Sequence, residues 1–210
     1  MLIQGLTGLQ NVNDGAANSQ ALRADKQGAL AVTELNPRYY ENAYRGKKFF
    51  GSNGATPTVT TVAFATTYTG LALINPANSG VNAVLDKVGL SFLVVFPAVS
   101  TVGLMVGFSN AGTTTFSAAA SSGASALIGS GLISKCTAAL SATLVGTPVL
   151  HTVFGSGLTG AVTVQTTQWA NYDLEGSVVI PPGGYAAIYT STVSGAASMC
   201  ASFNWTELPI

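Results

Sequence analysis

The sequence contains few charged side chains. Asp, Glu, Lys and Arg make up 8% of its 210 residues, whereas they make up about one quarter of an ordinary soluble domain. From residue 51 onward the only charged residues are Asp86, Lys87, Lys135, Asp173, Glu175 and Glu207. The surface of this part must therefore consist largely of Ser, Thr, Gly, Asn and Ala side chains. Such a surface favours contact with other protein chains over acid–base chemistry.

The sequence also lacks a basic cluster of the kind that binds phosphate. Its formal net charge is zero. The first 50 residues carry six basic and four acidic side chains, an excess of two: Arg23, Lys26, Arg38, Arg45, Lys47 and Lys48 against Asp14, Asp25, Glu34 and Glu41. Nucleic-acid binding requires clustered Lys and Arg side chains, so no nucleic-acid partner is expected.

No hydrophobic run has the character of a membrane-spanning helix. The most apolar window, Val88–Phe108, contains Pro97, Gly103 and Gly107, and its apolar residues are largely β-branched or aromatic. A Pro-centred break between two apolar runs predicts two buried strands joined by a turn. The start of the chain has no basic region followed by a continuous apolar core, so neither a signal peptide nor membrane association is predicted.

Residues that ligate metals or form disulfides are scarce. The chain has one histidine, His151, and two cysteines, Cys136 and Cys200. Together with scattered carboxylates they give no recognisable ligand spacing, so no metal site and no cofactor is expected. Two cysteines do not make a disulfide framework, and we favour buried thiols in two strands over a bridge.

Two stretches resemble parts of enzymes. Gly155–Gly160 matches the GxGxxG pattern of dinucleotide-binding loops, but a strand-like stretch follows it where a helix is required. It is interpreted as a hairpin loop. Asp173 and Glu175 stand two apart, as a pair of catalytic carboxylates could, but catalytic pairs usually come from separate elements. We interpret them as a solvated pair and expect no catalytic residues and no enzyme.

Residues 1–54 are predicted to form an extended N-terminal arm and linker. Gly and Asn residues punctuate the first part without a sustained apolar period, and 28–35 alternates loosely in the manner of a short strand. Asn36-Pro37 predicts the start of a short helical turn, with Tyr40 and Tyr44 on one face. Residues 46–54 are predicted to be a linker.

Residues 55–210 are predicted to form an all-β domain, an antiparallel β-sandwich or jelly roll. Its short apolar runs are separated by Gly, Pro and Asn turn signals. The stretch Ala118–Gly131, rich in Ala, Ser and Gly, is predicted to be a long loop. The predicted strands are Thr58–Thr67, Leu71–Asn75, Val84–Phe96, Gly103–Ser109, Cys136–Val145, Val149–Phe154, Ala161–Thr167, Ser177–Ile180, Tyr185–Thr190 and Met199–Glu207.

Five stretches together resemble virion structural proteins of tailed bacteriophages: Leu22–Val32, Arg38–Gly46, Leu71–Pro76, Pro181–Tyr189 and Phe203–Glu207. Head-decoration (cement) proteins, head fibres and tail components belong to this group. The resemblance implies an extended arm followed by a jelly roll, a homotrimer and no catalytic residues. It implies a capsid decoration protein of the virion, assembled in the bacterial cytoplasm, with the major capsid protein or other virion proteins as partners.

The arm is the expected site of attachment to the capsid or to a neighbouring subunit. Aromatic side chains supply anchors for such a contact, and basic side chains supply its polar rim. A helix packed on its own domain is the alternative for the same cluster. The candidate contact residues are Arg23, Lys26, Arg38, Tyr39, Tyr40, Tyr44, Arg45, Phe49 and Phe50.

Two other functions stay open at this stage. A phage tail or fibre component that binds a host receptor or glycan would use exposed aromatic residues, for which Trp169 and Tyr172 are the candidates. A glycan hydrolase would use Asp173 or Glu175, because a β-sandwich can host such chemistry.

Overall fold

The fold is taken from a computed structural model. It describes residues 4–6, 19–21, 37–53, 58, 63–93, 96, 98–109, 114–157, 169–193 and 199–210, with the backbone alone at 4–6, 19–21, 117–122, 157 and 169. The chain forms two compact units, 1–40 and 41–210. In the first unit, β1 (Gln4–Leu6) pairs antiparallel with β2 (Ser19–Ala21).

The second unit is built almost entirely from strands. A five-residue helix, α1 (Tyr40–Tyr44), stands where the two units join along the chain. The strands are β3 (Lys48–Ser52), β4 (Thr67–Ile74), β5 (Val81–Phe92), β6 (Ser100–Phe108), β7 (Thr115–Ser125), β8 (Ile133–Thr143), β9 (Val149–Gly157), β10 (Trp169–Ile180), β11 (Gly184–Thr190) and β12 (Met199–Pro209). Within the described residues, no helix has the length and hydrophobicity needed to cross a membrane.

Eight of these strands follow the winding of a jelly roll. The antiparallel sheet has the order β10-β5-β12-β3-β7-β8-β4-β11-β6-β9. One half holds β3, β12, β5 and β10, and the other holds β4, β11, β6 and β9. Along the chain, each strand of these eight lies in the opposite half from the one before it, except that β9 lies in the same half as β6. The predicted all-β jelly-roll class is therefore confirmed.

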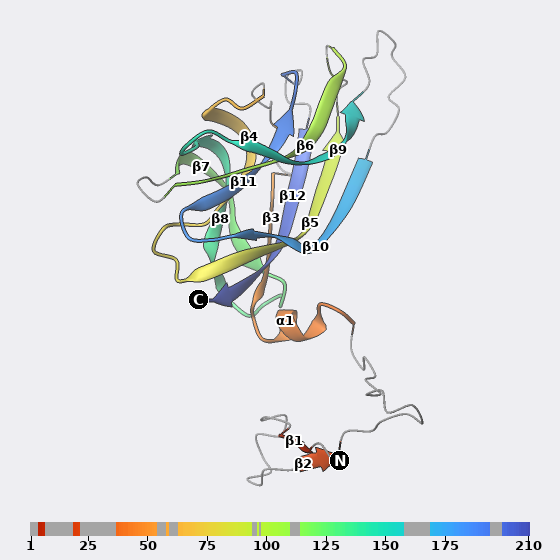
Figure 1. Ribbon diagram of the computed structural model, residues 1–210, viewed down its shortest axis with the longest axis vertical. Helices are drawn as coiled ribbons and strands as arrows, with labels where there is room; N and C mark the ends of the chain where they lie inside the picture. The colour runs from red at the N-terminus through yellow and green to blue at the C-terminus, as the bar shows by residue number, and fades with distance from the viewer. Residues whose placement is uncertain are drawn as a thin grey trace. The chain divides into compact units, whose positions relative to one another are not determined.

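The remaining two strands join the halves along one side. The β7–β8 hairpin is inserted between β6 and β9 in the sequence, and it lies between β3 and β4 in the sheet. The ends of the row, β9 and β10, curl toward one another (Figure 1), and the Tyr172 ring of β10 stacks on the Phe154 ring of β9. The sheet is thus nearly closed into a barrel.

The core fills the space between the two halves. Leu85, Phe203 and Trp205 from one half are buried in the same cluster as Leu104 and Ile188 from the other. The turn predicted within Val88–Phe108 is confirmed, since β5 ends at Phe92 and β6 begins at Ser100.

The predicted loop over Ala118–Gly131 is wrong in part, because residues 115–125 form β7 and only 126–131 lie in the turn before β8. The small residues of β7 are required by packing. A Cβ atom at Gly123 would lie 2.6 Å from the Trp205 ring and 2.6 Å from the Cβ of Ser134. A side chain at this position has no room, so the composition that resembles a loop belongs to a strand pressed against the core.

The predicted linker over 46–54 is also wrong. Residues 48–52 form β3, which pairs with β12 and β7. Phe49 is buried and its ring stacks on that of Trp205, with centroids 6.4 Å apart. The sheet thus begins before the boundary predicted at residue 54. Residues 48–52 form a strand because β12, which is distant in the sequence, pairs with them.

Three other predictions have mixed outcomes. The short helical turn near Pro37 is confirmed, although the helix begins at Tyr40, whose N–H donates to the Pro37 carbonyl. The predicted strand Thr58–Thr67 is wrong in part: Thr58 forms an isolated bridge and β4 begins only at Thr67. The predicted strands over 28–35 and 161–167 lie outside the described residues.

A buried ion pair ties three adjacent strands together. The Lys48 ammonium lies 2.6 Å from the Asp86 carboxylate, and the Thr206 hydroxyl donates to the same carboxylate oxygen at 2.8 Å. Asp86 is a bulge residue, since the β5–β12 register passes from Lys87 directly to Leu85. The bulge shifts the alternation of β5, so Leu85 and Val88 both enter the core.

Replacing Lys48 by Met should lower the free energy of unfolding by about 3–5 kcal/mol, because it leaves Asp86 buried without a counter-charge. Lys87→Met is the control. Its partner Asp173 lies 3.5 Å away and both side chains are at least 36% exposed, so about 0–1 kcal/mol is expected. Urea unfolding followed by tryptophan fluorescence measures both, and equal losses would contradict a special role for the buried pair.

Candidate functional site

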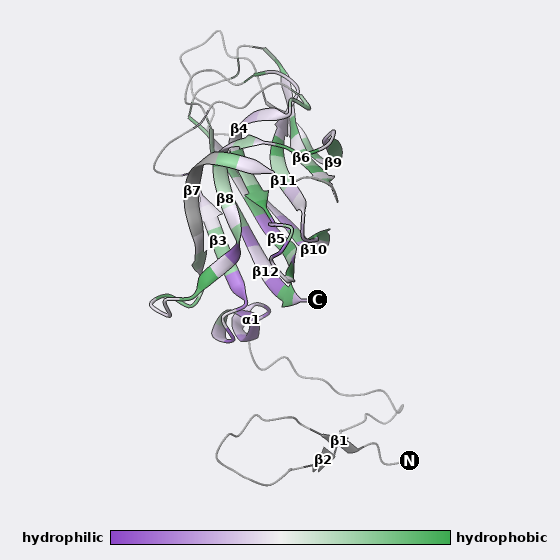
Figure 2. Cartoon of the chain, turned by 90° about the vertical axis from the view of Figure 1, so that its left-hand side faces the viewer, coloured by the Kyte–Doolittle hydropathy of each residue, from purple (hydrophilic) through white to green (hydrophobic). Residues whose placement is uncertain are grey.

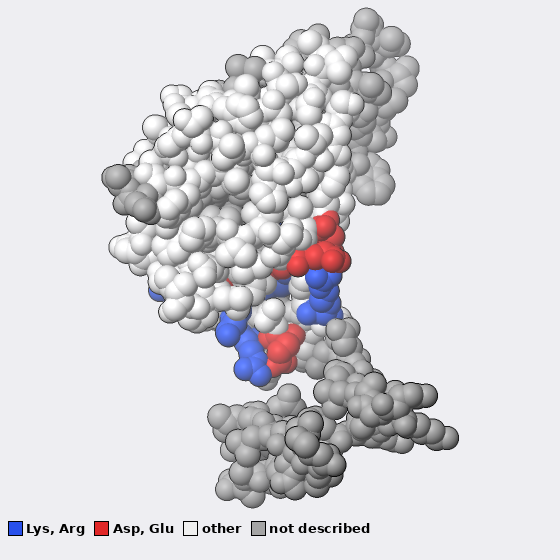
Figure 3. Space-filling model, viewed as in Figure 1, with Lys and Arg blue, Asp and Glu red and all other residues white. Residues whose placement is uncertain are grey.

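The charged residues of the second unit gather at one end of it. Residues 41–210 carry five acidic and five basic side chains, so this unit has no net charge. In the view of Figure 3 they lie together, and the rest of the visible described surface is uncharged. Ion pairs join Glu41 with Arg45, Lys48 with Asp86 and Lys87 with Asp173. Much of this charge is therefore engaged in pairs.

A further carboxylate, Glu207, is buried and held by hydrogen bonds. Its side chain accepts from the Ser134 hydroxyl, the N–H groups of Lys135 and Cys136, and the Trp205 indole. Burial, with a further contribution from Glu207, raises the pKa of the Cys136 thiol well above its usual range. Both Cys136 and Cys200 are free thiols in the structure. Glu207 thus fixes the start of β8.

The residues considered for chemistry do not come together. The Asp173 carboxylate pairs with Lys87 and also accepts from the N–H of Glu175. His151 is exposed, and its Nδ1 lies 2.6 Å from the Thr152 hydroxyl. Over the described part of the chain, no group of three or more His, Cys, Asp or Glu side chains is placed to hold a metal ion.

Exposed aliphatic side chains lie at the turn between β7 and β8. We call Leu127, Ile128, Leu132 and Ile133 the apolar tip; all are exposed, Ile128 to 81% and Ile133 to 73%. Figure 2 shows this turn in the hydrophobic colour, close to α1. Leu132 contacts Gly46, just after α1, because a Cβ atom on Gly46 would overlap the Leu132 side chain. The tip and α1 therefore form one surface.

The predicted arm residues have different environments. Arg23 and Lys26 lie outside the described residues. The Arg38 guanidinium lies over the Tyr39 ring, 5.3 Å from its centroid. Tyr40 and Tyr44 are exposed, and Arg45 pairs with Glu41 on α1. Phe49 is buried in the core and Phe50 is half-buried in β3. Of the predicted aromatic anchors in the second unit, Tyr44 is thus the most accessible.

The candidates for a glycan site lie on β10. Tyr172 stacks on Phe154 with ring centroids 4.1 Å apart, and its hydroxyl donates to the Phe154 carbonyl at 2.7 Å. One ring face and the hydroxyl are thus engaged within the protein. The backbone of Trp169 pairs with Ser91; its side chain is outside what the structure describes.

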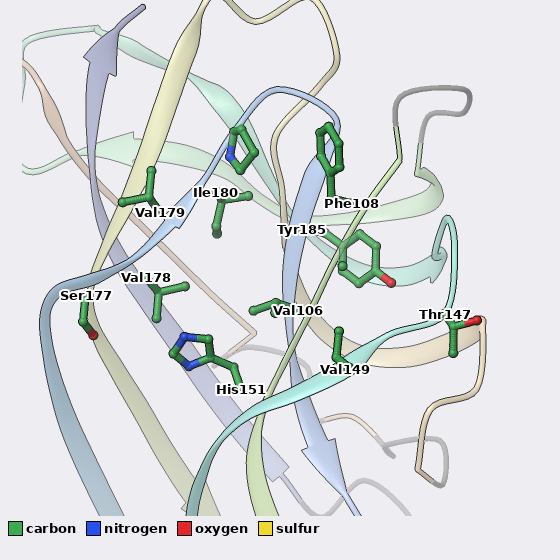
Figure 4. A pocket seen from close by; sticks show the side chains of 12 residues that line it. Val106, Phe108, Thr147, Val149, His151, Ser177, Val178, Val179, Ile180 and Tyr185 are labelled. Atoms are coloured by element: carbon green, nitrogen blue, oxygen red, sulfur yellow. The ribbon is translucent and has the colours of Figure 1, made fainter.

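A hollow of about 520 Å³ lies between β9 and β10 (Figure 4). It is lined by the start of β9 and the end of β10, whereas Phe154 and Tyr172 lie further along toward the other ends of these strands. Val149 and His151 line it from β9, and residues 177–180 line it from β10. The wall is completed by Val106, Gly107, Phe108, Thr147, Pro181 and Tyr185, and none of the lining residues is Asp, Glu, Lys or Arg. The hollow has the size of a ligand pocket, but an uncharged and largely aliphatic lining.

No protein-family model, no curated protein and no solved structure matches the chain. Its function therefore has to be argued from its own residues.

Sequence reasoning missed both the apolar tip and the hollow. The tip lies partly in the stretch predicted to be a loop, which ends at Gly131. Its signal was a group of aliphatic residues (127, 128, 132 and 133) amid Gly and Ser. The hollow had no local signal, because β9 and β10 meet only when the ten strands are arranged in the sheet.

Two buried tyrosines provide a test of the wall of the hollow. The Tyr68 hydroxyl donates to the Ile188 carbonyl at 2.9 Å, whereas the buried Tyr185 hydroxyl has no partner among the described residues. Burial raises the pKa of Tyr185 to about 12, so this hydroxyl stays protonated at neutral pH.

Tyr185→Phe should therefore raise the free energy of unfolding by about 1 kcal/mol, because it removes a buried unsatisfied group, and Tyr68→Phe should lower it by about 1 kcal/mol. Urea denaturation at neutral pH measures both variants. A clear loss of stability in Tyr185→Phe would show that its hydroxyl has a partner in solution.

Proposed function

We propose that the protein is a non-enzymatic structural protein of a bacteriophage virion, which decorates or cements the capsid as a homotrimer. Its arm and the surface beside α1 contact the major capsid protein or another virion protein. The observation that carries the proposal is the pairing of an exposed apolar surface with an almost uncharged jelly roll. The resemblance of several sequence stretches to phage virion proteins supplies the biological setting.

The surface at the apolar tip has the anatomy of a protein interface. Interfaces combine central apolar or aromatic anchors with a polar rim. Ile128, Ile133 and Tyr44 are exposed anchors on one surface. The Glu41–Arg45 pair on α1 supplies a rim whose charges are already paired. A partner can therefore cover this pair without stripping water from an unpaired charge.

The rest of the body suits packing between copies. Between Lys87 and Lys135, and again between Lys135 and Asp173, the sequence has no charged residue. Neutral surfaces of identical copies do not repel one another, and a closed cyclic arrangement buries them without leading to open-ended assembly. This supports a closed oligomer, and the resemblance of the sequence to phage virion proteins makes a homotrimer the proposed form.

Replacing Ile128 by Lys should weaken binding to empty shells of the phage that encodes the chain by about tenfold or more, because it puts a charge at the centre of the contact. Ile210→Lys is the matched control, since Ile210 is 76% exposed and lies outside the apolar tip. Co-sedimentation with shells lacking the protein measures both. Equal binding by the two variants would remove the tip from the contact.

The oligomeric state gives a second test. Sedimentation equilibrium of the full chain should give about three times the monomer mass of 21.2 kDa, and Ile128→Lys should leave this value unchanged. A stable monomer that has no affinity for shells would overturn the proposed function as a whole.

A further inference from the structure

Two core-facing side chains beside the hollow are left uncovered. Side chains alternate between the two faces of a strand, and Leu104 and Val106 of β6 pack in the core, so Phe108 points to the same side. Val149 of β9 stands directly opposite Val106, and its side chain therefore lies on this face as well. Yet Phe108 is 50% exposed and Val149 is 62% exposed. Among the described residues, the core side of the sheet is thus left open at this corner.

The hollow connects this open corner with the core. Val178 and Ile180 of β10 belong to the buried core cluster and line the side opposite β9. Figure 4 shows the His151 ring on β9 turned toward Val178. An apolar molecule in this space would contact the core cluster and would remove the exposed faces of Val149 and Phe108 from water. Burial of such apolar surface is favourable.

The hollow is short along the strands. On β9 its lining runs from Val149 to His151, and on β10 it runs from Ser177 to Ile180. At a rise of about 3.3 Å per residue, these spans measure about 7 Å and 10 Å. A strand of the usual five or six residues is about 17–20 Å long, whereas a molecule of one or two rings fits within the lining. The dimensions therefore favour a small molecule over a polypeptide segment.

The lining favours a neutral ligand. None of the described residues that line the hollow is Asp, Glu, Lys or Arg, and an ion buried without a partner pays a large cost in lost hydration. Three exposed lining residues, Thr147, His151 and Ser177, supply hydrogen-bonding groups. The His151 Nδ1 lies 2.6 Å from the Thr152 hydroxyl, which leaves Nε2 for a ligand. These groups suit a hydroxyl or carbonyl group at the edge of an apolar molecule.

We propose that the hollow between β9 and β10 binds a small neutral molecule, an apolar body of one or two rings that carries a hydroxyl or carbonyl group. The body lies between Val149 and Ile180, and its polar group contacts Thr147, His151 or Ser177. Ligand pockets commonly combine an apolar wall with a few polar groups in this way. The site goes beyond the proposed virion role and does not depend on it, because it can be tested on the isolated chain.

The experiment uses β-naphthol, a neutral two-ring molecule with one hydroxyl, and β-naphthalenesulfonate, which has the same rings and a negative charge. Each is titrated at neutral pH into the full chain with isotope-labelled Val and Ile methyl groups, and NMR follows the methyl signals. β-Naphthol should shift the signals of Val149, Val178 and Ile180 saturably, with a dissociation constant below about 1 mM. The sulfonate should bind about tenfold more weakly or worse.

Val149→Lys and Val99→Lys test the position of the site. Both valines are 62% exposed, and Val149 lines the hollow whereas Val99 does not. Val149→Lys should weaken binding of β-naphthol about tenfold and should strengthen binding of the sulfonate, because it puts an ammonium group beside the hollow. Val99→Lys should change both affinities less than about twofold. Loss of structure alone would weaken both probes and would not reverse the preference between them.

Three outcomes would overturn the proposal. The first is the absence of saturable shifts at millimolar β-naphthol. The second is equal affinity for the two probes, or equal effects of the two substitutions. The third is nuclear Overhauser contacts of the Val149 methyl groups with residues 1–40 or with a second copy in the unliganded chain, which would identify a polypeptide as the occupant. Loss of shell binding in Ile128→Lys has no bearing on these results, so the two proposals fail separately.

Discussion

The packing of Trp205 connects the parts of this fold. Its buried ring stacks on Phe49 of β3 and leaves room for no side chain at Gly123 of β7, so the first half of the jelly roll and the inserted hairpin meet on one side chain. Its indole N–H donates to Glu207, whose carboxylate also holds the start of β8. The apolar tip lies between the ends of β7 and β8, and its position therefore depends on this arrangement.

Scarce charge makes the placement of each charged group consequential. With ion pairs and a hydrogen-bonded carboxylate gathered at one end, the remaining body is held by backbone ladders, apolar packing and hydrogen bonds of uncharged side chains such as Tyr68. A buried ion pair adds little net stability compared with a hydrophobic pair, but a buried charge that has lost its partner is costly. Lys48 and Asp86 thus constrain β3, β12 and β5 to one register more than they strengthen the domain.

Local patterns predicted most strands and the fold class, because alternation and turn residues are visible in sequence. They failed where a distant partner decides the structure. Residues 48–52 become a strand because β12 lies beside them, and 115–125 become one although their small side chains suggested a loop. For the site, the exposure of Tyr40 and Tyr44 was predictable from a short polar helix. The burial of Phe49 and the existence of the hollow depend on strand order, which no local pattern contains.

The two end strands bear on how a protein with so little charge avoids unwanted pairing. A neutral sheet with two regular, open edges would pair with any exposed strand, including its own. Among the described residues, both end strands are irregular: residues 174–177 of β10 bulge opposite Asp86, and the register of β9 against β6 shifts twice. Bulges bend a strand and increase its twist, which makes its edge a poor template for a further strand. Backbone irregularity thus does at these edges part of what charged side chains do in most sheets.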